Sequence, residues 1–224
     1  EIEWAQFSGT VEARDRLSFL SGDSLRAEFI RTPEQPSSLA KVTGRGHVLA
    51  VAGARRIDPN LVGPAQDSFV VGDSLEVSFK PSTAKAGDVD PTFALATGNV
   101  RAANRDAEIR AQRFEVGLTR DDKNRVAASN LQAIGSVVFT RRVGIAARAD
   151  ELKADATGKT AELTGRSVAV SRGASKILGT QMRMEEDEGR LLVFGPGSFL
   201  HDQESGEDAK AGEPTKVRAT WTKS

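Results

Sequence analysis

Short stretches in which apolar and polar residues alternate recur along the chain. In residues 25–29, 75–79 and 114–118, for example, every second side chain is apolar. A period of two places successive side chains on opposite faces of a strand, so these stretches predict strands with one buried face. Ranges 101–112 and 146–156 are rich in Ala, Arg and Glu and favour a helix by composition. Because propensity is a weak guide, the spacing of the repeats decides for strands there as well.

A Gly-x-Val step followed by an alternating stretch repeats along the sequence. The spacing from Val11 to Leu25 in one copy equals the spacing from Val100 to Phe114 in another. A fixed spacing of this kind is the signature of a repeat architecture. The copies start at Gly9, Gly46, Gly98, Gly135 and Gly165, the last with one extra residue before Val168, and a degenerate sixth copy starts at Gly195.

Residues 131–155 form the clearest unit, in which two predicted strands flank a basic turn at Arg141-Arg142. The copy that starts at Gly46 is longer than the others, and its insertion falls within 53–67, which is rich in Pro and Gly. Further loops and turns are predicted where Pro, Gly and charged residues gather. These loops and turns are 32–38, 72–73, 81–91, 121–124, 157–159, 185–189 and 201–214.

Many short strands separated by turns predict an all-β fold with few or no helices, built as a sandwich, a barrel or a solenoid-like jellyroll. Apolar faces stabilise such a fold only if two of them oppose each other. We expect a single domain over 1–224, with 1–40 as an edge unit. The ends, 1–7 and 216–223, are similar alternating stretches. This similarity is expected of a fragment of a longer repeated protein, and coincidence between two short strands is the alternative.

The chain has 31 acidic and 31 basic residues, so its formal net charge is zero. This balance argues against a nucleic-acid-binding protein, which carries a basic excess. No stretch is apolar for long enough to cross a bilayer as a helix. The absence of cysteine excludes disulfides and thiolate metal sites, and the two histidines form no recognisable metal motif. We therefore expect neither a metal nor a cofactor.

The tetrapeptide Gly-Asp-Ser-Leu occurs at 22–25 and at 72–75, and it gives its name to a hydrolase family in which the Ser is the nucleophile. Ser24 or Ser74 would need a His base that is oriented by a carboxylate. That family places the His three residues after an Asp, but neither histidine of this chain has an Asp at that position. We therefore expect no enzyme, and we interpret both tetrapeptides as hairpin turns that lead into a second strand.

Five arginines have two interpretations. They could meet anionic head groups at an edge of the sheet, or they could be solvated, outward-facing charges that discourage aggregation of edge strands. These residues are Arg101, Arg105, Arg110, Arg141 and Arg142.

Over residues 93–199 the order and spacing of several motifs resemble the OstA-like β-jellyroll family of lipopolysaccharide transport. This family includes a periplasmic bridge protein and the N-terminal domain of the outer-membrane translocon subunit. The motifs that carry the resemblance are 95–100 (LATGNV), 111–116 (AQRFEV), 131–137 (LQAIGSV), 147–152 (ARADEL), 163–165 (LTG) and 177–182 (ILGTQM).

The resemblance implies a V-shaped, two-sheet β-jellyroll that is open along one side and holds acyl chains in an apolar groove. It also implies a non-enzymatic role in transporting or bridging lipid or lipopolysaccharide in the periplasm or cell envelope. Its partners would be other β-jellyroll domains, or copies of itself, stacked end to end through uncovered edge strands.

Inward positions of the predicted strands are the candidate ligand-binding residues of this groove. They are Val48, Leu75, Val77, Phe79, Val100, Phe114, Val116, Val137, Phe139, Leu152, Met182, Met184 and Val193. Many other inward positions are Ala, which predicts a narrow interior. The alternative is that these residues form a closed core, as in a structural or scaffold repeat module of a larger cell-envelope protein.

Overall fold

The computed structural model describes residues 3–14, 18–32, 35–52, 68–82, 88–120, 126–202 and 216–222. Within these ranges the chain forms strands and turns but no helix, and so it has no helix that could cross a membrane. The strands are β1 (Trp4–Arg14), β2 (Ser18–Thr32), β3 (Gln35–Ala52), β4 (Phe69–Pro81), β5 (Val89–Ala103), β6 (Ala107–Arg120), β7 (Val126–Arg141), β8 (Ile145–Asp155), β9 (Thr160–Arg172), β10 (Ser175–Glu185), β11 (Arg190–Phe194), β12 (Gly197–Asp202) and β13 (Lys216–Trp221).

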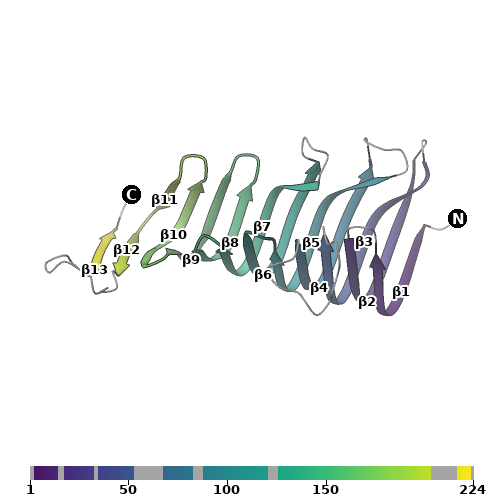
Figure 1. Cartoon of the computed structure of the whole chain (residues 1–224), viewed down its shortest axis with the longest axis horizontal. Coiled ribbons are helices and arrows are strands. Elements are labelled where there is room, and N and C mark those ends of the chain that lie inside the picture. The colour runs from purple at the N-terminus through teal and green to yellow at the C-terminus, as the bar shows by residue number, and fades with distance from the viewer. Residues whose placement is uncertain are drawn as a thin grey trace.

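All of these strands belong to one antiparallel sheet. From β1 to β10 each strand pairs with the next strand in the sequence, and the order continues through β12 to β13. Strand β11 pairs with β10 beside β12. The chain therefore advances along the sheet, and its two ends lie at opposite ends of the molecule (Figure 1).

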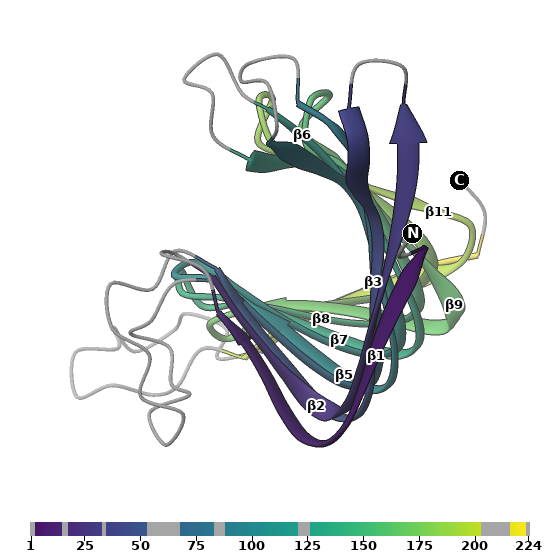
Figure 2. The ribbon, with the colours of Figure 1, turned by 90° about the vertical axis from the view of Figure 1, so that its right-hand side faces the viewer.

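Each long strand bends near its middle, where the register of its pairing shifts. In β7 the shift falls between Ile134 and Val137. The bends line up across the sheet and give it a V-shaped section that is open on one side (Figure 2). We call the part of the sheet that contains 126–134 the long arm, and the part that contains 137–141 the short arm. The expected all-β fold is confirmed, and the two predicted sheets are the two arms of one continuous sheet.

The Gly-x-Val steps lie at these bends. Gly98 and Asn99 have φ values of 74° and 49°, and Gly135 and Ser136 have values of 85° and 49°. A left-handed residue within a strand bulges and bends it, and glycine adopts this conformation without steric cost. The repeated step is therefore the corner at which a strand passes from one arm to the other.

The two Gly-Asp-Ser-Leu tetrapeptides occupy the same corner on β2 and β4. Both strands run through it without a break, so the predicted hairpin turns, including the one at 72–73, are wrong. Asp23 lies against the corner of β3, where its Oδ2 atom is 3.1 Å from Nδ1 of His47. Gly and Asp are suited to a bend inside a strand as well as to a turn between strands, because a bend and a turn both need backbone conformations that these residues tolerate.

Some of the predicted loops differ from the structure. Most of 32–38 is strand, since β3 begins at Gln35, which pairs with Thr32. Pro36 is tolerated there because β3 pairs with β4 only from Lys41 onward, so the start of β3 has one neighbour. Of the loop predicted at 81–91, Pro81 belongs to β4 and 89–91 belong to β5, and 83–87 lie outside the described residues.

The turn predicted at 157–159 is confirmed, and the one predicted at 185–189 is found at 186–189, since Glu185 ends β10. Ranges 101–112 and 146–156 contain strands rather than helices. Residues 53–67, 121–124 and 203–214 of the predicted loops lie outside the described residues. The loop expected to begin at His201 begins later, since His201 belongs to β12.

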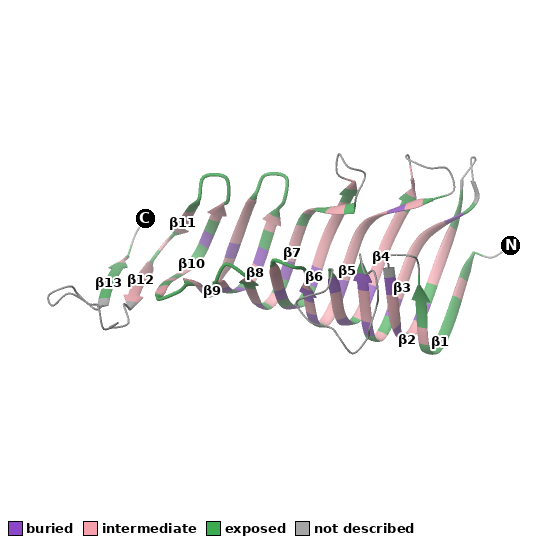
Figure 3. Ribbon diagram, in the orientation of Figure 1, coloured by how far each residue is buried: buried purple, intermediate pink, exposed green. Residues whose placement is uncertain are grey.

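The main hydrophobic core fills the apex of the V. Leu163 and Met182 of the long arm are fully buried there, as is Val168 of the short arm. Buried residues recur near the bend on successive strands, while residues farther along the arms are more exposed (Figure 3). A second, smaller cluster consists of Phe19, Val51 and Phe69. It lies on the outer face of the short arm, where the Arg101 guanidinium covers the ring of Phe69 at 5.2 Å.

Candidate apolar groove

Cross-strand pairing joins the inward side chains into two apolar rows, one on each arm. Consecutive members of each row are directly paired residues of neighbouring strands. The row on the long arm is Phe7, Leu25, Gly44, Leu75, Ala96, Phe114, Ala133, Leu152, Leu163, Met182 and Val193. The row on the short arm is Ala13, Leu20, Ala50, Val70, Ala102, Ile109, Phe139, Ala147, Val170, Ile177, Phe199 and Ala219.

The alternation along each strand places all of the sequence-predicted groove residues on the inner face. All except Phe79 and Met184 belong to the main core cluster or pack against it, and these two are half-buried. The residues that are themselves buried are Val48, Leu75, Val100, Phe114, Val137, Leu152 and Met182. Those that are half-buried against the cluster are Val77, Val116, Phe139 and Val193. The strands thus bring the predicted set together between the arms.

Burial on the inner face decreases from the bend to the rims. In β7, Ala133 and Val137 flank the corner and are buried, whereas Leu131 and Phe139, two residues farther out on either arm, are half-buried. The apex of the V is therefore filled by protein side chains, which exclude other molecules. The outer parts of both walls keep apolar surface that a ligand between the arms would contact.

Many inner-face residues are not among the sequence-predicted groove residues. Leu163, Val168 and Val170 are buried in the same cluster as the predicted residues, and Leu131, Ile177 and Leu191 pack against it. Small residues such as Ala96 and Ala133 also complete the rows. Extending the alternation along each strand would have identified these residues, because every second residue on one side of a corner faces the same way.

Residues 83–190 match the family model described as LptA/(LptD N-terminal domain) LPS transport protein. The matched range is slightly less than half of the chain, and it resembles this family. Seven chains of solved structures also match, among them LptH, described as the LptA-homologous periplasmic component of the conserved lipopolysaccharide transport device from Pseudomonas aeruginosa. That match has 10% identity and a TM-score of 0.42, and it covers 69% of this chain and 94% of LptH. No curated protein sequence matches the chain.

The match to the LptA/LptD N-terminal family spans β5 to β10 and confirms the expected resemblance. The family is described by a transport role, in agreement with the expectation that the chain is not an enzyme. Both apolar rows extend past the matched range into strands on each side. Predicted groove residues that lie outside the matched range are Val48, Leu75, Val77, Phe79 and Val193.

The outer faces of the arms carry paired charges. Arg101 donates to Glu108 at 2.9 Å, and Arg110 donates to the same carboxylate at 2.7 Å. These two arginines are therefore outward-facing charges on neighbouring strands, as one of the two interpretations predicts. Asp90 is an exception because it is buried, and the Arg120 guanidinium donates to it at 2.7 Å. This hydrogen bond holds the pKa of the Asp90 carboxyl below its ordinary value.

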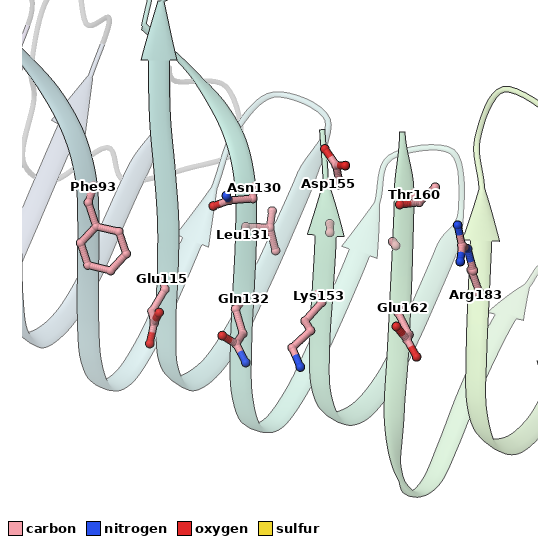
Figure 4. Close-up of a pocket in the computed structure, with 12 residues that line it drawn as sticks. Phe93, Glu115, Asn130, Leu131, Gln132, Lys153, Asp155, Thr160, Glu162 and Arg183 are labelled. Atoms are coloured by element: carbon pink, nitrogen blue, oxygen red, sulfur yellow. The ribbon is translucent and has the colours of Figure 1, made fainter. Parts of the chain in front are cut away.

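A depression of about 430 Å³ lies on the outer face of the long arm (Figure 4). Most of its lining has the outward phase, for example Glu115, Gln132 and Lys153. It contains none of the predicted groove residues. The complete lining is Phe93, Glu115, Asn130, Leu131, Gln132, Lys153, Ala154, Asp155, Thr160, Ala161, Glu162 and Arg183.

Ser74, one of the two serines weighed as a nucleophile, forms a hydrogen bond across the sheet. Its Oγ atom lies 2.7 Å from Oγ1 of Thr97 on β5. This contact joins two strands near the corner of the V. It gives Ser74 a hydroxyl partner where a nucleophile would need an imidazole base.

Proposed function

We propose that this chain is a non-enzymatic lipid-transport or bridging module of the cell envelope, which holds the acyl chains of a lipopolysaccharide-type lipid between its arms on the periplasmic side. The observation that carries the proposal is the pair of unbroken apolar rows that face each other from one end of the sheet to the other. The match to a lipopolysaccharide transport family supports the class of cargo.

The burial gradient suggests how the cargo is held. Each methylene group transferred from water to an apolar surface contributes about 0.8 kcal/mol, so half-exposed walls can bind several acyl chains. Beyond the filled apex, half-buried inner positions such as Val116 on β6 and Leu131 on β7 are apolar and directly paired, and neither row contains a charged side chain. A bound chain therefore meets similar surroundings along the whole axis, which suits a lipid that has to slide.

Changing Phe139 to aspartate is expected to weaken lipid binding roughly tenfold or more, because a carboxylate would replace half-buried apolar surface on the inner wall. Native mass spectrometry with lipopolysaccharide, and separately with phospholipid, measures the bound lipid. The matched control is Val138→Asp, which places the same charge on the outer face one residue away, opposite Arg110 and Arg148. Val138→Asp should bind lipid like the wild type.

Circular dichroism and thermal melting establish that both variants are folded. Equal binding by Phe139→Asp and Val138→Asp would show that the inner wall does not hold the lipid. If the folded wild-type protein binds neither lipid, the transport proposal is wrong. The chain would then be a structural module with a closed core.

We further propose that such modules stack end to end through their edge strands. Strand β1 forms one edge, and β11 and β13 form the other edge on the long and short arms. Trp4 and Phe7 on β1 are 52% and 57% exposed, and Phe194 and Val217 at the opposite edge are each 42% exposed. An edge strand offers unpaired backbone groups to another chain, and a second jellyroll placed there would continue both apolar rows.

Changing Phe7 to lysine is expected to raise the dissociation constant of self-association roughly tenfold, since burial of this ring would otherwise contribute about 1.5–3 kcal/mol. Sedimentation velocity over a range of protein concentrations measures the association. The control is Val143→Lys, which changes an apolar residue that is 63% exposed but lies in the turn between β7 and β8. A wild-type mass that does not depend on concentration, or an equal effect of the two lysines, would contradict end-to-end stacking of this chain.

A further inference from the structure

An ion pair crosses the open side of the V. Arg141 is the last residue of β7, at the rim of the short arm, and Glu186 follows the last residue of β10, at the rim of the long arm. Nη1 and Nη2 of Arg141 lie 3.1 and 3.2 Å from Oε1 of Glu186. Each residue stands two positions beyond an inner-face residue, namely Phe139 and Met184. The pair therefore spans the mouth of the space between the apolar walls.

A second guanidinium lies in the same row at the rim of the short arm. Arg141 pairs in register with Ile145, and Ile145 pairs with Arg172. The Arg172 side chain is exposed, and within the described parts of the chain it has no ion-pair partner. The short arm thus presents two arginines above the apolar wall that contains Phe139 and Val170.

At the rim of the long arm, the acidic residues Glu186 and Asp187 make different kinds of contact. Lys159 donates to Asp187 at 2.6 Å, and the Glu186 amide donates to the Lys159 carbonyl at 2.9 Å, so two turns of the long arm hold each other. The Lys159–Asp187 pair stays within one rim, whereas the Glu186 carboxylate reaches the opposite rim. Both partners of the Arg141–Glu186 pair are solvent-accessible, and ion pairs of this kind contribute little and exchange readily.

A lipid whose acyl chains lie on the apolar walls leaves its head group at this mouth. Guanidinium groups bind phosphate through paired, charge-assisted hydrogen bonds that fit its geometry. We propose that Arg141 and Arg172 bind phosphate groups of the lipid head, and that Glu186 holds Arg141 across the mouth until a phosphate replaces its carboxylate. This inference rests on the proposed lipid-binding function, and it adds the chemistry that selects a phosphorylated lipid.

The test compares lipopolysaccharide with the same lipopolysaccharide from which the phosphates have been removed. The double variant Arg141→Gln/Arg172→Gln is expected to bind the phosphorylated lipid roughly tenfold more weakly than the wild type, because charged hydrogen bonds are lost. The dephosphorylated lipid should bind both proteins equally. Arg148→Gln is the control, since it removes an exposed arginine that faces outward beside Val138. Inorganic phosphate in millimolar excess should not displace the lipid, because it lacks the acyl chains.

The outcomes separate this inference from the function on which it rests. If the wild type binds neither lipid, the proposed function fails. If the wild type binds both lipids and the double variant either matches it or loses both equally, the phosphate site is wrong. Displacement of the lipid by inorganic phosphate alone would also overturn the site as one for a lipid head group.

Glu186→Gln is expected to change the affinity for the phosphorylated lipid in the opposite direction. Without the carboxylate, Arg141 is free to meet phosphate, so binding of the phosphorylated lipid is expected to tighten severalfold. Asp187→Asn removes the same charge from the same turn, but from a pair within one rim, and its effect should be smaller. Weaker binding by Glu186→Gln, or equal effects of the two changes, would overturn the role of Glu186.

Discussion

Replacing Leu163 with alanine is expected to lower the free energy of unfolding by about 2–5 kcal/mol, the usual cost of removing a large side chain from a packed core. Leu163 is 0% exposed and stands in the long-arm row between Leu152 and Met182, its paired neighbours on the two adjacent strands. The cavity would open at the apex of the V, where the two arms share one core. Urea denaturation, followed by circular dichroism, measures the loss.

The matched control for Leu163 is Leu95→Ala. Leu95 has the outward phase on β5 and is half-buried between Glu76 and Glu115, its cross-strand partners. Removing it takes away less buried area and leaves no enclosed cavity, so a loss of about 1 kcal/mol is expected. Equal losses for the two variants would mean that the apex of the V is not the main core of the molecule.

The alternation of the sequence was sufficient to predict the strands and the faces on which their side chains lie. In β7, for instance, Val137 and Phe139 face inward and Val138 faces outward, as a period of two requires. The repeat spacing also decided correctly against a helix over 101–112. Propensity failed there because the cross-strand pairing of β5 and β6 outweighs the preference of single residues.

The corners could not be recognised from one sequence. Gly72-Asp73 has the composition of a hairpin turn, but the chain bends there and continues in the same strand. The two cases differ in what the next residues pair with. After a hairpin turn they fold back on the same strand, and after a bend they continue beside the neighbouring strand. Local composition carries no information about that choice, whereas the lined-up register shifts of all the strands do.

The ion pair at the mouth of the V also could not be predicted from the sequence. Arg141 was recognised as a basic residue next to a turn, but its partner is 45 positions away in the sequence. The two residues meet only because the arms converge at that place, which depends on the angle of every corner between them. The apolar rows are easier to predict, because pairing between neighbouring strands follows the order of the sequence.

The character of the inner-face side chains changes along each arm, from the corner to the rim. Near the corner, large side chains such as Val137 close the apex and stabilise the sheet. Farther out, Phe139 offers apolar surface, and Arg141 ends the same strand with a charge. Three residues of one strand, each two positions from the next, thus pass from the core to the proposed lipid wall and then to the proposed head-group site.

Replacing Gly98 with alanine is expected to lower the free energy of unfolding by roughly 2–5 kcal/mol, the sum of a left-handed backbone penalty and a steric clash. Gly98 has a φ of 74°, and an added Cβ atom would lie 2.7 Å from Cβ of Asp73 at the neighbouring corner. Asp73 cannot rotate its own Cβ away, so the corners of β4 and β5 would have to separate. Thermal melting and urea denaturation measure the loss.

Gly144→Ala isolates the steric part of this effect. Gly144 has nearly the same φ, 77°, but it lies in the turn after β7, and an added Cβ atom would meet nothing within 4 Å. Its replacement should therefore cost only the backbone penalty of about 1–2 kcal/mol. The difference between the two variants measures how tightly adjacent corners pack. Equal losses would mean that the corners can separate without cost, and the V would then be a flexible sheet instead of a fixed frame for its apolar walls.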